Sequence, residues 1–293
     1  MARELPRTIR TLTTPYQRDI GAADIELIVV DNGSSLPVDA ALLSQLHRGP
    51  TVVEHVRPAP PSPARAANIG LELASGALVG LVVDGARMAS PGLLATACLA
   101  NGLADRAVVA TLGWHLGPRR HMEADQHGYD QSVEDELLDG LGWEEDGYRL
   151  FEIATFAGSS GRGWFGPIGE SSALFLTAAR WAELGGLDEH FDLPGGGLVN
   201  HDLYRRACDG ATLVVLLGEG TFHQIHGGAA TSGRLSWEEM HAQYERLRGG
   251  PYRPPGGAPL YVGRVPGPVL PHLGESVRLA ERRVARRRSP GEG

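Results

Sequence analysis

The chain has 293 residues and a formal net charge of −8, and 42% of its residues are hydrophobic, which is enough for one large domain. The acidic balance argues against general nucleic-acid binding, and no run reaches the roughly 18 apolar residues that a membrane span needs. The first residues lack the apolar stretch of a signal peptide, so we expect a cytoplasmic protein.

Strand and helix patterns alternate along the first 112 residues. Short apolar runs predict strands at 25–30, 51–56, 78–83 and 107–112. Amphipathic patterns predict helices at 6–12, 38–46, 64–73 and about 91–99. Alternation of this kind is typical of an α/β fold with a mostly parallel central sheet and helices on both faces.

The apolar run at 78–83 ends abruptly at Asp84. In open α/β sheets ligands bind at the carboxyl edge of the strands, so we consider Asp84 a candidate binding residue. Its alternative role is structural, because Asp is also a common turn former. Ser90 and Pro91 then predict the N-cap and first turn of the next helix.

The second half of the chain begins with a less regular stretch. Residues 113–169 carry many histidines, acids and aromatics with weak periodicity, which is typical of long binding loops. Strands are predicted at 170–176 and 213–217, and helices at 178–184, from 202 to 208 and from 237 to about 247. His223 and His226 follow the last of these strands closely, and the Pro- and Gly-rich residues 249–271 are expected to wrap the surface.

The carboxyl-terminal tail departs from the acidic balance of the chain. Its last sixteen residues hold six arginines, namely Arg278, Arg282, Arg283, Arg286, Arg287 and Arg288. Two interpretations stay open. The tail is either a solvated, frayed helix or a docking face for anionic lipid or an acidic partner, which would give a weak contact with a membrane surface.

Five stretches, taken in order, resemble family-2-type glycosyltransferases of the GT-A fold. They read ELPRTIRTL, IELIVVDNGSS, ARAANIGLELASG, LVVDGAR and SALFLTAARWAELGGLDEHF, within about residues 3–230. The resemblance implies a nucleotide-binding half at 1–112, an acceptor-side half of the same domain at 113–248 and a carboxyl-terminal extension at 249–293. It also implies transfer of a sugar, with inversion, from a nucleotide-sugar donor to a glycan or small-molecule acceptor, as in polysaccharide biosynthesis.

The same resemblance assigns binding roles. Asp31 would contact the base of the nucleotide, and Arg65 and Asn68 would lie near the nucleotide. Asp84 would reach the ribose or a metal ion, Mn²⁺ or Mg²⁺, together with His223 or His226. The second acid of the family's D-x-D motif is absent, and Arg87 would supply positive charge for the diphosphate instead. The alternative for the two histidines is a role in stabilising their loop.

The general base is left open between several acids. Only Asp202 matches the family's acidic pair, and Glu170 or an acid of residues 113–169 are the other candidates. Asp202 has a helix N-cap as its alternative role. The family's opening strand is also expected to be missing, so the backbone groups of the strands that would flank it should be unpaired. Two alternatives stay open: the start of the protein is assigned too late, or another segment of the chain fills the position of that strand. These departures motivate a second hypothesis, a catalytically silent GT-A-fold binding or scaffold protein.

Aromatic residues of the irregular stretch suggest an acceptor groove, because such rings stack on sugars. The candidates are Trp114, Trp143, Tyr148, Phe151, Trp164 and Phe165, with burial in the core as the alternative. Residues 158–165 are rich in glycine and serine and are expected to form a mobile lid.

Overall fold

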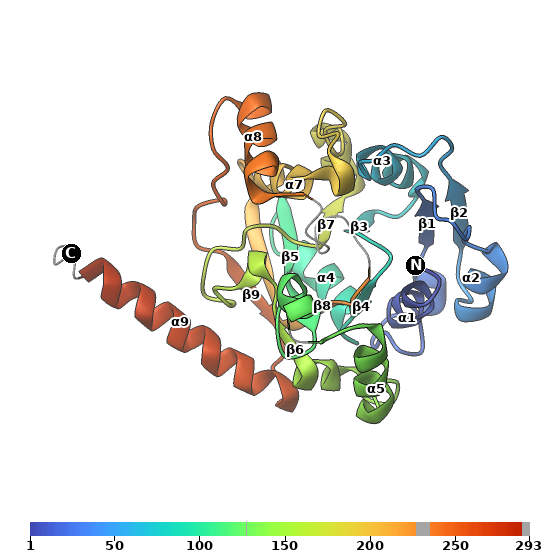
Figure 1. The fold of residues 1–293 in the computed structure, drawn as a ribbon, viewed down its shortest axis with the longest axis horizontal. Coiled ribbons are helices and arrows are strands. Elements are labelled where there is room, and N and C mark those ends of the chain that lie inside the picture. Colours follow the sequence, from blue (N-terminus) through green and yellow to red (C-terminus); the bar gives the residue numbers. More distant parts are fainter. Residues whose placement is uncertain (127, 227–234, 289–293) are drawn as a thin grey trace.

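The computed structural model describes residues 1–126, 128–226 and 235–288, and it shows a mixed α/β architecture with a central sheet flanked by helices (Figure 1). The main sheet has seven strands. Five of them follow one another in space in the order β3 (Leu78–Val82), β7 (Ala173–Thr177), β5 (Ala107–Leu116), β8 (Thr212–His223) and β4 (Arg87–Ala89). The other two are β6 (Ala154–Phe156), which pairs with β5, and β9 (Leu260–Gly263), which pairs with β8. A second sheet pairs β1 (Leu27–Asp31) with β2 (Thr51–His55).

The helices connect and cover these strands. Their bounds are α1 (Glu4–Thr11), α2 (Ala40–Leu46), α3 (Ala64–Leu73), α4 (Leu93–Asn101), α5 (Gln131–Leu141), α6 (Ala178–Leu184), α7 (Val199–Cys208), α8 (Trp237–Arg248) and α9 (Leu270–Arg288). Short 3₁₀ turns join them, including η2 (His121–Gln126), η3 (Gly147–Ile153) and η4 (Gly158–Ser160).

The alternation of side chains along the central strands creates one apolar core on each face of the sheet. In β5, Val109 packs with Ala97 of α4 on one face, whereas Val108 and Ala110 join the larger cluster on the other. Successive side chains of a strand point to opposite faces, so a strand apolar at every position needs cover on both sides. The predicted α/β class with helices on both faces is therefore confirmed.

The direction of the strands differs from the expected mostly parallel sheet. β5 is parallel to β8, and β8 is parallel to β9. The pairs β3–β7, β5–β7, β4–β8 and β5–β6 are antiparallel. Strands β4, β6 and β7 therefore run opposite to β5, β8 and β9, and strand patterns in the sequence do not show direction.

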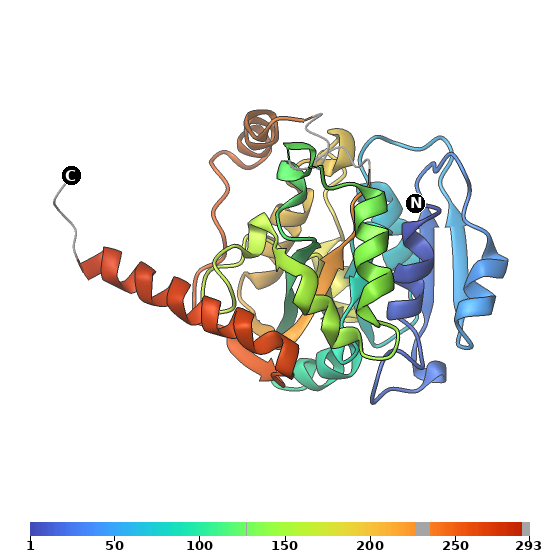
Figure 2. The same ribbon diagram turned by 60° about the horizontal axis from the view of Figure 1, so that its bottom comes forward.

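The two-stranded sheet stands apart from the main sheet, as Figures 1 and 2 show on the side of the molecule that carries the amino terminus. Helix α3 contacts both β1 and β3, so it connects the two sheets. Within the described residues, β1 pairs only with β2, and β3 pairs only with β7. The unpaired strand edges expected from the sequence are therefore present on β1 and β3.

Several predicted elements have the observed bounds, and others need correction. Helices α3 and α6 begin and end where predicted, and Thr177 caps α6 by accepting a hydrogen bond from Arg180 N at 3.2 Å. The helix after Asp84 has Gly92 at its N-cap, because the Ser90 hydroxyl is hydrogen bonded to the Glu219 carboxylate instead. Residues 113–169 contain the end of β5, helix α5 and strand β6 in place of the expected loops.

The final helix leaves the body of the molecule. Both ribbon views show α9 extending outward on the side opposite β2 (Figures 1 and 2). The tail is helical through Arg288, as one of its two interpretations predicted. Among the described residues, no helix is long and apolar enough to cross a membrane.

Candidate metal centre

Asp84 occupies a tight turn directly after β3. Its φ of +80° is a left-handed conformation that few residues other than glycine adopt. The side-chain Oδ1 accepts a hydrogen bond from Ala86 N at 2.8 Å, which closes the turn. The second carboxylate oxygen, Oδ2, faces away from this bond toward two histidines. The turn role and the binding role of Asp84 therefore fall on different oxygens.

The two histidines lie far from Asp84 in the sequence, 139 and 142 residues later. His223 is the last residue of β8, where it pairs with Arg87 of β4 on one side and His115 of β5 on the other. Its Nε2 lies 3.0 Å from Asp84 Oδ2, and His226 Nε2 lies 3.1 Å from the same oxygen. The two Nε2 atoms are 3.0 Å apart. The structure thus brings together Asp84, His223 and His226 as the sequence predicted.

The spacing of these three atoms fits a divalent cation. All three lie within 4.8 Å of one another, and each offers one ligand atom. Adjacent ligand atoms around a six-coordinate ion with bonds of about 2.1 Å are separated by about 3 Å. Two imidazoles and one carboxylate on one side of an ion leave its other positions open for substrate oxygens. The donor set therefore fits a catalytic metal ion.

A third histidine fixes the protonation of His223. His121 Nε2 donates to the Leu116 carbonyl oxygen at 2.9 Å, so in its neutral form His121 Nδ1 is an acceptor. His121 Nδ1 lies 3.2 Å from His223 Nδ1, which must then be the donor. This assignment leaves a lone pair on His223 Nε2, directed at the Asp84 carboxylate. Either a bound cation or a proton on His226 Nε2, which lies 3.0 Å from His223 Nε2 and 3.1 Å from Asp84 Oδ2, satisfies these two electron-rich atoms.

The electrostatics of the site favour the ligand form of Asp84 and of His223. Burial and the nearby Arg87 guanidinium lower the pKa of His223, which keeps the imidazole neutral. Burial alone would raise the pKa of Asp84, but His223, His226 and Arg87 hold it well below its ordinary value. A carboxylate and neutral imidazoles are the protonation states that bind metal ions.

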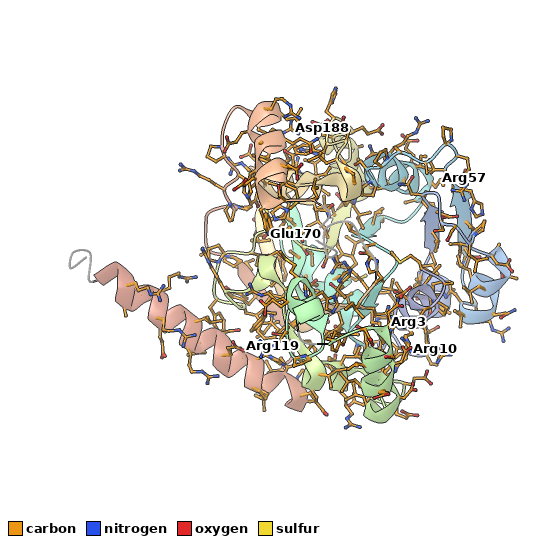
Figure 3. All side chains as sticks on the ribbon, in the orientation of Figure 1. Arg3, Arg10, Arg57, Arg119, Glu170 and Asp188 are labelled. Carbon is orange, nitrogen blue, oxygen red and sulfur yellow. The ribbon has the colours of Figure 1, made fainter. Side chains whose placement is uncertain are left out.

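The segment that carries His226 is fixed by residues that sequence reasoning missed. Ile225 N donates to Glu134 Oε2 at 2.8 Å, and Arg3 donates to both Glu134 Oε1 and the Ile225 carbonyl oxygen. Gln224 Nε2 donates to the Glu4 carbonyl oxygen at 3.1 Å. Figure 3 shows Arg3 at α1, between the main sheet and α5. The many histidines and acids of residues 113–169 were the signal in the sequence, although they did not identify His121 or Glu134.

Two further predicted residues lie at the same edge of the sheet. Arg87 is fixed beside His223 by strand pairing, and its Nε donates to the Val83 carbonyl oxygen at 2.7 Å. Glu170 lies three residues before the start of β7, whose first residue, Ala173, pairs with Val82 at the end of β3. Figure 3 shows Glu170 near the middle of the molecule, and it makes no hydrogen bond or ion pair among the described residues.

Asp202 has a different environment from the one expected. It lies inside the first turn of α7, with Leu198 at the N-cap, so the N-cap interpretation is wrong. Its carboxylate is buried, and Arg248 Nε donates to Oδ1 at 2.5 Å while Arg206 Nε donates to Oδ2 at 2.8 Å. Both oxygens are engaged in ion pairs with arginines, so neither is directed at a substrate.

The residues assigned to the nucleotide do not gather at the metal centre. Asn68 donates to the Leu187 carbonyl oxygen and accepts from Leu187 N, so its amide joins α3 to the turn that follows α6. Asp31 is buried at the end of β1 and accepts from Ser34 N at 2.8 Å, and Arg65 is exposed on α3. For Asn68 the structure shows a structural role. Nucleotide contacts by Asp31, Arg65 and Asn68 stay predictions.

The expected aromatic acceptor groove is wrong for most of its members. Trp114, Phe151 and Trp164 are fully buried, and Trp143 is almost so, because they form the larger core cluster. Tyr148 is half-buried and donates its hydroxyl to Glu219 at 2.7 Å. These rings pack on one another, with Trp114 stacked on Phe156 at 4.2 Å between ring centroids.

The segment 158–165 does not have the features of a lid. Ser160 Oγ accepts from Gly113 N at 2.9 Å, and Trp164 Nε1 donates to the Leu216 carbonyl oxygen at 3.0 Å. Glycine at 163 adopts a φ of +65° and places the backbone against Ser276 of α9. The segment is packed into the core, and the lid expectation is corrected.

A cavity lies next to the histidines instead. It has a volume of about 470 Å³ between the end of β5 and α5, and its lining includes Gly117, Arg119, Tyr129, Val133, Leu137 and Ile153. The ring of Tyr129 stacks on His121 with 6.0 Å between ring centroids. Tyr129, which lines the cavity, and His121 therefore lie between the cavity and His223.

No protein-family model and no curated protein matches this chain. Similar solved structures include S. aureus TarS 1-349 in complex with UDP, with 14% identity and a TM-score of 0.47 over 84% of this chain and 66% of that one. GalNAc-T7 with UDP, GalNAc and Mn²⁺ has 16% identity and a TM-score of 0.49, and the match covers 85% of this chain and 49% of that one. The mannosyltransferase PcManGT from Pyrobaculum calidifontis with GDP-Man and Mn²⁺ has 18% identity and a TM-score of 0.45, covering 99% and 73%. This chain spans less than two thirds of the length of the TarS and GalNAc-T7 chains that it matches.

Proposed function

We propose that this chain is a GT-A-type glycosyltransferase that moves a sugar from a nucleotide-sugar donor to a glycan or small-molecule acceptor, with inversion. The observation that carries the proposal is the convergence of Asp84, His223 and His226 at the edge of the sheet, with Arg87 beside them. A cation and a guanidinium at one sheet edge suit a diphosphate ligand.

The donor set favours Mn²⁺ over Mg²⁺. Two of the three ligand atoms are imidazole nitrogens, and Mg²⁺ prefers oxygen ligands and retains its water. When bound, the cation neutralises the negative charge that develops on the nucleoside diphosphate leaving group.

The chain's own residues account for the rest of the reaction. Arg87 is in reach of the metal centre and stabilises the departing diphosphate through its fixed positive charge. A carboxylate accepts the proton of the acceptor hydroxyl while the hydroxyl oxygen forms a bond to the anomeric carbon of the sugar. The bond between that carbon and the diphosphate oxygen breaks, and the nucleoside diphosphate leaves with the bonding electrons. The cavity beside Tyr129 has a volume within the range of small-molecule sites and is our candidate for the acceptor.

The metal centre can be tested through donor binding and turnover. Release of nucleoside diphosphate is measured for UDP-, GDP- and dTDP-sugars with Mn²⁺ and with Mg²⁺. We expect Mn²⁺-dependent release, and we expect D84N and H223A to lower it by at least about 100-fold, because each removes a ligand. D105N changes an exposed acid and serves as the control. No turnover, together with no Asp84-dependent binding of any nucleotide, would favour the catalytically silent scaffold.

Glu170 is our choice of general base over Asp202, because the Asp202 oxygens are engaged by Arg206 and Arg248. We expect E170Q to lower kcat by about 100-fold or more, with donor affinity unchanged. We expect D202N to lower thermal stability first, since it leaves two arginines partly unpaired. Steady-state kinetics and thermal unfolding of both variants separate the roles. A kcat loss confined to D202N would reverse the assignment.

A further inference from the structure

Trp237, the first residue of α8, differs from the other tryptophans in its exposure. Its exposed fraction is 48%. The other four tryptophans are buried in the core, namely Trp114, Trp143, Trp164 and Trp181. Two imidazoles lie beside the Trp237 ring: His201 is edge-on with 6.5 Å between ring centroids, and His241 is tilted by 37° at 5.8 Å. A large aromatic surface is thus held between two neighbours and left open to solvent.

His201 brings unused hydrogen-bonding groups to this surface. It lies in the first turn of α7 and also packs edge-on against Tyr252, with 5.0 Å between ring centroids. Neither of its ring nitrogens forms a hydrogen bond among the described residues, and its Nδ1 is buried. Its Nε2 is not buried and is open to a ligand. Buried polar groups normally have a partner, so this imidazole indicates a place where a bound molecule completes the hydrogen bonding.

Glu170 lies beside the same imidazole. Tyr252 donates its hydroxyl to the carbonyl oxygen of Gly169, the residue before Glu170. Burial lowers the pKa of His201 and raises that of Tyr252, and the charge of Glu170 raises both. His201 is therefore neutral near pH 7, with one nitrogen as a donor and the other as an acceptor. We call Glu170, His201, Trp237 and Tyr252 the α7–α8 patch.

We propose that the α7–α8 patch binds one sugar ring of a glycan acceptor. This inference rests on the proposed function and narrows its acceptor class. The C–H groups on one face of the sugar lie on the Trp237 indole, and a sugar hydroxyl pairs with His201 Nε2. A second hydroxyl then faces Glu170, the carboxylate that accepts its proton.

A small apolar acceptor fits the patch less well, because it would cover the indole and leave the His201 nitrogens without a partner. The patch lies at α7 and α8, whereas the cavity beside Tyr129 lies at α5 (Figure 1). An acceptor that uses both places therefore has more than one sugar unit.

Fluorescence quenching tests the proposal, because Trp237 is the exposed one of five tryptophans, all of which the structure describes. The full chain is titrated with methyl glucoside, methyl mannoside, cellobiose and chitobiose in the presence of acrylamide. We expect at least one sugar to lower the quenching constant by about twofold or more, since a bound ligand buries most of the surface that it touches. W237F should lose the quenchable signal, which assigns that signal to Trp237.

H201F keeps the ring but removes both nitrogens, and it should weaken sugar binding by about tenfold. H201N retains a polar group and should recover part of the affinity. The matched control is H190F, the same substitution at an exposed histidine after α6, which should leave sugar affinity unchanged. Circular dichroism confirms that each variant is folded.

The outcomes separate this inference from the proposed function. No protection by any of the sugars, equal protection by cyclohexanol, or equal sugar affinity in H201F and wild type would overturn the inference. Protection by UDP or GDP alone would also overturn it and assign the patch to the donor. Release of nucleoside diphosphate without protection of Trp237 would leave the proposed function standing, whereas protection without release would overturn the proposed function alone.

Discussion

Two of the three ligands of the candidate metal centre, Asp84 and His223, are positioned through the atom that does not face the ion site. Asp84 uses Oδ1 to accept from Ala86 N, which leaves Oδ2 directed at the histidines. His223 uses Nδ1 to donate to His121, which leaves Nε2 as an acceptor. Preorganisation of this kind lowers the conformational cost of binding, because neither side chain must choose a rotamer or tautomer when the ion arrives.

His121 gives the first prediction at this scale. We expect H121F to weaken Mn²⁺ binding by about 10- to 100-fold, because His223 loses its hydrogen-bond acceptor and its tautomer is no longer fixed. H121N retains an acceptor near the position of Nδ1 and should recover most of the affinity. Calorimetric titration with Mn²⁺ gives the affinities, and the electron paramagnetic resonance spectrum of bound Mn²⁺ reports its ligand field. Equal affinities for wild type and H121F would show that His121 only fills space.

Asp31 gives a prediction about pH. Burial alone would raise the pKa of its carboxyl, but hydrogen bonds from Ser34 and the neighbouring His55 and Arg57 lower it to about 2. A lowered pKa stabilises the fold above the unfolded value near 4, and the contribution is lost as pH falls toward 2. D31N should therefore cost about 2 kcal/mol at pH 7 and about half of that at pH 3. Urea unfolding at both pH values measures the difference, with D105N as control. A cost independent of pH would contradict the ionic origin.

The residues of the metal centre were predictable to different degrees. Asp84 follows an apolar strand pattern, which predicted a place at the edge of the sheet, whereas the late histidine, His223 or His226, was expected beside it only from the resemblance to GT-A glycosyltransferases. The role of Asn68 was not predictable, because a sequence motif indicates which face of a helix a residue occupies but not which part of the chain packs against that face. Likewise, the choice between Glu170 and Asp202 depended on Arg248, which is 46 residues from Asp202 in the chain.

At the scale of elements, the pairing of strands is uneven across the molecule. β5 and β8 are long, buried strands with partners on both edges. β1 and β2 have five residues each, pair only with each other among the described residues, and are half-buried along most of their length. A short sheet with open edges is held mainly by the helices that pack on it.

We expect this difference to appear in amide hydrogen exchange. Amides of β1 and β2 should exchange at least about 100-fold faster than those of β5 and β8, because local opening of a two-stranded sheet breaks few contacts. Peptides that cover residues 27–31 and 107–116 allow the comparison by mass spectrometry. Similar protection in both regions would mean that the two sheets open together as one cooperative unit.

At the scale of the whole molecule, the sequence predicted the class of the fold better than its topology. Periodicity identified α3 and α6 at their observed bounds, because local patterns determine where a helix begins and ends. It did not reveal that β7 and β6 run antiparallel to β5, since strand direction depends on the path of the connecting segments. The division of the chain at residues 112 and 248 stays a prediction.

The amino-terminal helix has a practical consequence for handling the protein. Arg3 and the Glu4 carbonyl contact the segment that carries His226, and Met1 lies against the turn at Gly85. An affinity tag or dye joined to Met1 would crowd these contacts, and one joined beyond α9 would alter its charge. The exposed connection between α4 and β5 is a better place for a label, since it is separated from His115 by the length of β5, about 25 Å.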